Sequence, residues 1–149
     1  MKVLPAVALV AVLFFLGQFQ FLSIAGVNPN LFLIALLFFA VKADKFRFLG
    51  ILLAVSAVLT VLFDPLWLLR VWGVLLVVLV FYLLKSFMTG NRFYDFLIGI
   101  AVGTFLFYHV VNLFNFDLPY ALIFMEIVYN LALGILLWVV YGRLFSRRA

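Results

Sequence analysis

The side chains able to do acid–base chemistry in this chain are few and stand far apart. Asp64, Asp95, His109 and Glu126 lie in or beside long apolar runs. They form no zinc-type His pair, and the chain has no Gly-rich phosphate loop and no nucleophile-elbow serine. A lone His is a poor metal site, and the absence of cysteine excludes thiolate ligands and disulfides. The sequence therefore predicts a protein that is not an enzyme and that uses no metal and no cofactor.

Glu126 is the acid placed deepest within an apolar run, and Asn130 and Gly134 follow it on the same helical face. An ionisable group inside a membrane is costly, so it is expected to face protein or water and to mark a functional position. Asp64 closes an earlier apolar run. We predict partner contacts at Asp64, Glu126 and Asn130. The alternatives are structural hydrogen bonding or proton relay for Glu126, and an ion pair with Arg70 for Asp64.

Two glutamines stand at the end of the first apolar run. Gln18 and Gln20 are two residues apart, which is too close for both to share one face of a helix. Both are further candidates for partner binding. The alternative is that they are interfacial amides that hydrogen-bond to lipid headgroups or to the backbone.

Small residues recur at fourfold spacing in two of the apolar runs. Ser56 and Thr60 precede Asp64 at this spacing, and Gly99 and Gly103 form a GxxxG pattern. Small side chains at this spacing let helices of a membrane protein approach closely. The predicted helix-packing residues are therefore Ser56, Thr60, Gly99, Gly103 and Gly134. For GxxxG, packing within the chain is favoured over dimerisation.

The elements that must position these residues are apolar segments that fill the chain. Hydrophobic residues make up 70% of the 149 residues and charged residues 10%, whereas soluble domains are about 45–50% apolar and about 25% charged. The sequence predicts an all-α integral membrane protein, a compact bundle of six transmembrane helices in a single domain. The segments run from about Val3 to Ile24, Leu31 to Val41, Phe48 to Phe63, Leu66 to Leu84, Phe93 to Asn112 and Leu118 to Tyr141.

The second and third of these segments are shorter than the roughly 20 residues that a membrane crossing needs. They must include flanking residues, thin the bilayer or pack inside the bundle. A re-entrant hairpin made of the two is the alternative.

The basic residues stand at the ends of the segments. With six crossings and the N-terminus in the cytoplasm, nine of the ten Lys and Arg residues fall on the cytoplasmic side, and Arg70 does not. Because cytoplasmic loops are enriched in Lys and Arg, both termini are predicted to be cytoplasmic. The same placement indicates that the positive charge sets topology and binds no nucleic acid. The first apolar run exceeds a signal-peptide core, which favours a retained helix.

Several features in chain order resemble one family of bacterial membrane proteins. The first run closes on glutamine, Pro29-Asn30-Leu31 opens the second, the third ends at Asp64, and Tyr129-Asn130 precedes a basic tail. Together they resemble the rod shape-determining membrane proteins of the MreD family. Ser56 and Thr60 depart from the family pattern, which has glycines before the acid of the third helix.

The resemblance implies a non-catalytic scaffold of the cell-elongation machinery in the bacterial inner membrane. Its implied partners are an MreC-like protein, the actin-like MreB and peptidoglycan synthases, all organised at the lipid bilayer. The resemblance also implies a fold similar to the substrate-binding subunits of energy-coupling factor transporters. The alternative function is therefore a vitamin-binding subunit of such a transporter, although Ala6, Ala8 and Ala11 miss the fourfold spacing that those subunits use for coupling.

Overall fold

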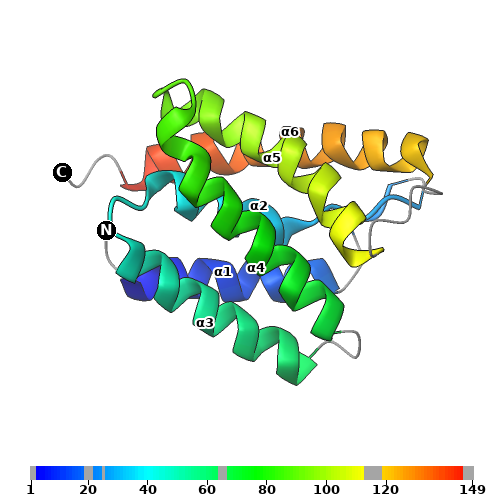
Figure 1. The fold of residues 1–149 in the computed structure, drawn as a ribbon, viewed down its shortest axis with the longest axis horizontal. Coiled ribbons are helices and arrows are strands. Elements are labelled where there is room, and N and C mark those ends of the chain that lie inside the picture. The colour runs from blue at the N-terminus through cyan, green and yellow to red at the C-terminus, as the bar shows by residue number, and fades with distance from the viewer. Residues whose placement is uncertain (1–2, 19–21, 25, 64–66, 113–118, 146–149) are drawn as a thin grey trace.

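The protein is described by a computed structural model that covers residues 3–18, 22–24, 26–63, 67–112 and 119–145. These residues form six α-helices and one 3-10 turn, so the all-α prediction is confirmed (Figure 1). The elements are α1 (Val3–Gln18), α2 (Leu31–Lys42), α3 (Phe46–Phe63), α4 (Trp67–Leu84), η1 (Lys85–Phe87), α5 (Arg92–Val111) and α6 (Tyr120–Phe145).

Three helices in the described part of the chain are long and apolar enough to cross a membrane. They are α3, α5 and the Tyr120–Arg143 portion of α6, with 18, 20 and 24 residues. α1, α2 and the Trp72–Phe87 stretch are shorter apolar helices. Together the three long helices indicate a multi-pass membrane protein.

Successive helices run in opposite directions, so α1 begins and α6 ends at the same end of the bundle (Figure 1). We call this the basic end, because the basic residues of the helix ends and of the α2–α3 turn gather there. Those that the structure describes are Lys42, Lys45, Arg47, Lys85, Arg92 and Arg143. Arg70 lies in the first turn of α4, at the opposite end.

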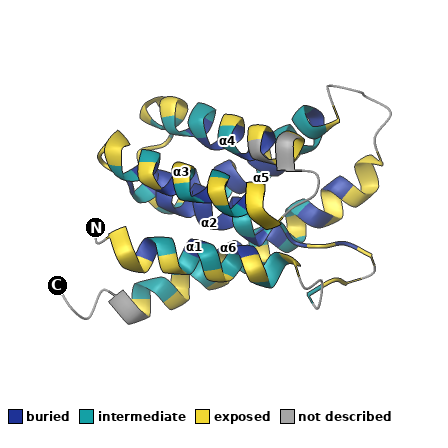
Figure 2. Ribbon diagram, turned by 90° about the horizontal axis from the view of Figure 1, so that it is seen from below, coloured by how far each residue is buried: buried dark blue, intermediate teal, exposed yellow. Residues whose placement is uncertain are grey.

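α2 occupies the centre of the bundle. It contacts all five other α-helices, and Figure 2 shows it as a buried helix among partly exposed ones. A helix that is apolar on every side is stable only when it is surrounded, and from Leu33 to Ala40 no residue of α2 exceeds 2% exposure. At 12 residues it is about 18 Å long. The second segment is therefore short, as predicted, and it packs inside the protein.

The third segment includes flanking residues, which is one of the predicted options: α3 begins at Phe46 and reaches 18 residues. This length is enough to cross a membrane. The predicted end of the first segment is wrong. α1 ends at Gln18, well before Ile24. Ile24 and Val27 exchange two backbone hydrogen bonds of 3.1 and 2.9 Å, around a turn in which Gly26 has a φ of +79°, a conformation that glycine adopts without strain.

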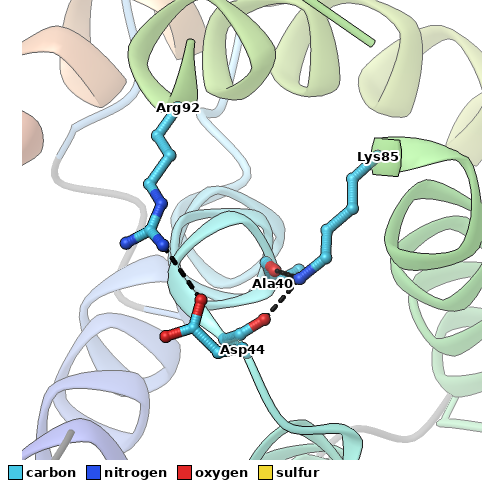
Figure 3. A network of polar contacts seen from close by, with 5 residues as sticks. Ala40, Asp44, Lys85 and Arg92 are labelled. Carbon is cyan, nitrogen blue, oxygen red and sulfur yellow. Dashed lines mark hydrogen bonds and ion pairs between the residues drawn. The ribbon is translucent and has the colours of Figure 1, made fainter. Parts of the chain in front are cut away.

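The basic end of α2 is held by η1, which follows α4, and by α5. Lys85 Nζ donates to the carbonyl of Ala40 at 3.3 Å and to the carbonyl of Ala43, and Arg92 pairs with Asp44 at 2.9 Å. Figure 3 shows the two basic side chains reaching this end of α2 from different sides. The last carbonyls of a helix lack partners within it, and cations there are favourable. The end of α2 is thus anchored by charge.

The glycines of the predicted packing set lie at contacts between helices. A Cβ placed on Gly99 would lie 2.6 Å from the ring of Phe81 in α4. At Gly134 it would lie 2.3 Å from Ile100 in α5. Gly103 faces α2 and α4, because the nearest atoms to its Cβ position belong to Leu37 and Val77.

Ser56 and Thr60 are buried on α3. Each hydroxyl donates to a carbonyl one turn earlier in the same helix, at 2.7 Å to Leu52 and 2.8 Å to Ser56. These bonds satisfy the two hydroxyls inside an apolar environment, where an unpaired hydroxyl is costly.

Candidate functional site

A connected polar network crosses from α5 and α6 to the start of α2. The side chain of Asn130 is fully buried and accepts a hydrogen bond from the backbone N–H of Asn30 at 3.0 Å. Its amide nitrogen donates to Thr104 at 3.0 Å and to Glu126 at 3.5 Å. Buried polar groups are stable when they are paired, and here one amide joins three elements.

Glu126 is buried beside this amide on α6. One of its carboxyl oxygens accepts a hydrogen bond from the hydroxyl of Tyr108 on α5, and the other accepts one from the amide of Asn130. A carboxyl group inside an apolar helix needs such partners, because unpaired burial of a charge is costly. The pairing places a titratable group among hydrogen-bond donors from two helices.

The segment that leads into α2 is fastened to the same face of α6. The side chain of Asn30 accepts from the N–H of Leu33 at 3.0 Å and caps the start of α2. The hydroxyl of Tyr129 donates to the carbonyl of Leu22 at 2.7 Å. The neighbouring residues Tyr129 and Asn130 therefore hold the chain on both sides of the Gly26 turn.

A cleft of about 360 Å³ lies at this end of the bundle, opposite the basic end. It lies between the end of α1, the residues before α2, the end of α3, the start of α4 and the facing ends of α5 and α6. The polar side chains that line it include Gln18, Asn28, Arg70, Tyr108, Asn112 and Glu126. The lining thus offers one guanidinium, one carboxyl group and several amides, a combination suited to binding a polar group by hydrogen bonds.

The predicted site residues have different positions. Gln18 is exposed and lines the cleft, Glu126 lines it from a buried position, and Asn130 lies behind it in the network. The structure thus brings Gln18, Glu126 and Asn130 to one end of the bundle. Asp64 and Gln20 lie outside the described residues.

Sequence reasoning missed the face of α5 that completes the site. Thr104 and Tyr108 are spaced by four residues and bond to Asn130 and Glu126 of α6, which have the same spacing. This matching period was a usable signal, because residues four apart share a helical face.

The other two ionisable residues of the apolar runs are satisfied locally. His109 is buried, with Nδ1 2.9 Å from the carbonyl of Phe105. Asp95 is buried at the start of α5 and accepts from the N–H and the hydroxyl of Thr89, at 2.9 and 2.7 Å. Within the residues that the structure describes, no three His, Asp or Glu side chains gather as a metal site.

Replacing Asn130 by Leu is expected to lower the free energy of unfolding by about 1–3 kcal/mol, because the half-buried N–H of Asn30 loses its acceptor. Asn112→Leu is the matched control, since this exposed amide donates to the carbonyl of Tyr108, one turn earlier, and makes no link to another helix among the described residues. Unfolding in mild detergent measures the loss, and hydrogen exchange over residues 28–33 should rise only in Asn130→Leu. Equal losses in the two variants would contradict a linking role for Asn130.

Comparison with protein-family models, with curated proteins and with solved structures finds no match to this chain.

Proposed function

We propose that this protein is a non-catalytic membrane scaffold similar to the MreD family, which organises partner proteins of the cell-elongation machinery. One observation carries the proposal. Two of the sequence stretches on which the resemblance rests touch each other, since the N–H of Asn30 bonds to the side chain of Asn130. Tyr129 adds a second link, to the carbonyl of Leu22. This contact supports treating the two stretches as one structural unit.

The proposed orientation has six crossings in the bacterial inner membrane, with both termini in the cytoplasm. Support comes from the basic end, where Lys42, Arg47, Lys85 and Arg92 lie together, because Lys and Arg favour the cytoplasmic side. In this orientation the cleft opens toward the outer side of the membrane. In this orientation the short α2 lies in the middle of the bilayer, surrounded by the other helices.

Partner binding is proposed at the cleft. Gln18 is exposed there and Glu126 lies at its wall, so a partner segment that enters the cleft meets amide and carboxyl groups. Helix association in lipid depends on close packing and on polar contacts of this kind, because lipid supplies no hydrophobic drive between helices. An MreC-like protein and peptidoglycan synthases are the proposed partners at the cleft. MreB, which is actin-like, is a proposed partner on the cytoplasmic side.

Affinity capture of the full chain from a native-like membrane tests this proposal. We expect recovery of an MreC-like protein or a peptidoglycan synthase, and we expect Gln18→Trp to reduce it about tenfold by filling the cleft, a change of about 1.4 kcal/mol. Val12→Trp is the matched control, because Val12 is exposed on α1 and is not among the residues that line the cleft. Normal recovery with Gln18→Trp would remove the cleft from the interface, and failure to recover these partners with the wild type would contradict the scaffold.

The second candidate function is a vitamin-binding subunit of an energy-coupling factor type transporter. The cleft favours it, because a volume of about 360 Å³ with mixed polar lining falls within the range of small-molecule sites. Capture of an ATPase together with a transmembrane coupling subunit, in place of the elongation proteins, would establish this alternative.

A further inference from the structure

A second hollow lies at the basic end, beside the turn between α2 and α3. It has a volume of about 510 Å³ and is bounded by the start of α1, the end of α2 and the first turns of α3. Its charged lining consists of Lys42, Asp44, Lys45 and Arg47. The cleft with Glu126 lies at the other end of the bundle, so the two hollows are separate sites.

The charges of this hollow do not cancel. The carboxylate of Asp44 is engaged by Arg92 at 2.9 Å, and the ammonium of Lys42 lies about 4.5 Å from the centre of the Tyr141 ring, inside the bundle. Lys45 and Arg47 are exposed, and no acidic side chain in the described part of the chain pairs with either. The hollow therefore presents two cations that an anion can approach.

Apolar side chains border these two cations. Val3 and Ile51 line the hollow and are themselves exposed, and Phe46 is exposed between Lys45 and Arg47 in sequence. A free inorganic anion gains nothing from such a border. A phospholipid does, because its phosphate meets the cations while its acyl chain covers the apolar residues, as basic pockets at membrane interfaces do.

The wall of the hollow is held in place before any ligand arrives. Lys85 and Arg92 anchor the end of α2 and the turn that follows it (Figure 3). A site whose wall is already ordered loses less conformational entropy when a ligand binds. The basic residues at this end therefore have two different roles. Lys85 and Arg92 fix the turn, whereas Lys45 and Arg47 are exposed on it.

We propose that this hollow is a binding site for an anionic phospholipid, with the phosphate held by Lys45 and Arg47 and an acyl chain lying along Val3 and Ile51. The proposal requires only that the protein resides in a membrane. It holds for a scaffold and for a transporter subunit alike, so its failure is distinguishable from failure of the proposed function.

Native mass spectrometry of the purified full chain with added phosphatidylglycerol tests the site. A basic residue close to an anionic membrane surface strengthens binding roughly fivefold. We therefore expect Arg47→Gln to lower the affinity for phosphatidylglycerol about fivefold, and the double variant Lys45→Gln with Arg47→Gln to lower it about 25-fold. Arg143→Gln is the matched control, since it removes one exposed charge at the same end and Arg143 is not part of the lining. It is expected to retain wild-type binding.

Three results would overturn the proposal. Equal loss with Arg143→Gln would mean general attraction to the basic end. Binding of phosphatidylcholine as tight as that of phosphatidylglycerol would show that charge does not select the lipid. Displacement of bound lipid by an equal concentration of inorganic phosphate would show a site for free anions. Unchanged thermal unfolding of all variants controls for folding, because every substituted side chain is exposed.

Discussion

Replacing Phe38 by Ala is expected to lower the free energy of unfolding by about 3–5 kcal/mol, the range for removing a buried ring. Phe38 is fully buried on the central helix α2. Its ring packs edge-on against Phe96, Trp138 and Tyr141, with ring centres 5.5, 5.6 and 4.9 Å away. The substitution therefore leaves a cavity between α2, α5 and α6.

The loss at Phe38 is expected even in lipid, where burial against water contributes little. What disappears is the dispersion energy of a close-packed ring, and the ammonium of Lys42 loses one of the rings that surround it. Thermal unfolding in mild detergent measures the effect, and Phe124→Ala is the control because Phe124 is 66% exposed on α6. If Phe124→Ala were as destabilising as Phe38→Ala, the central position of α2 would be contradicted.

Gly99→Leu is expected to destabilise the protein by about 3 kcal/mol, at the upper end of the cost of overfilling a packed interior. The Cβ alone would lie 2.6, 2.9 and 3.1 Å from three atoms of the Phe81 ring. A ring edge cannot fold away as a flexible chain end does, so α4 and α5 must separate.

Gly50→Leu is the matched control for Gly99→Leu. Gly50 lies within α3, and nothing stands within 4 Å of its Cβ position. Leu is a better helix former than Gly by about 0.8 kcal/mol, so this variant should equal or exceed the wild type in thermal unfolding. Similar destabilisation by the two substitutions would mean that α4 and α5 are not in close contact at Gly99.

Much of the fold can be predicted from the sequence, because long apolar runs bounded by charged residues are stable in a membrane as α-helices. The predicted starts of the fourth and fifth segments lie within one residue of α4 and α5. The predicted first helix is too long because Leu22 and Ile24 are apolar, whereas the turn at Gly26 depends on backbone geometry. Hydropathy does not report backbone geometry.

The candidate site was only partly predictable for a related reason. Glu126 and Asn130 are conspicuous because polar residues are costly in an apolar helix. Thr104 and Tyr108 are less so, since each is common in such helices on its own. Only the alignment of α5 with α6 makes them a site, and one sequence does not specify which helices face each other. The bond from the N–H of Asn30 to Asn130 likewise joins residues 100 apart in the sequence.

The position of α2 also bears on the order in which the chain is built. α2 is second in the sequence, yet α4, α5 and α6, which cover much of it, are synthesised later. A helix of 12 residues falls short of the roughly 20 that hold a segment across a bilayer by itself. The contacts of α2 with α6, among them the bond from the N–H of Asn30 to the side chain of Asn130, can form only after α6 has been synthesised. A nascent chain cut short before α6 has an incomplete centre, so the last helix acts as the closing step of assembly.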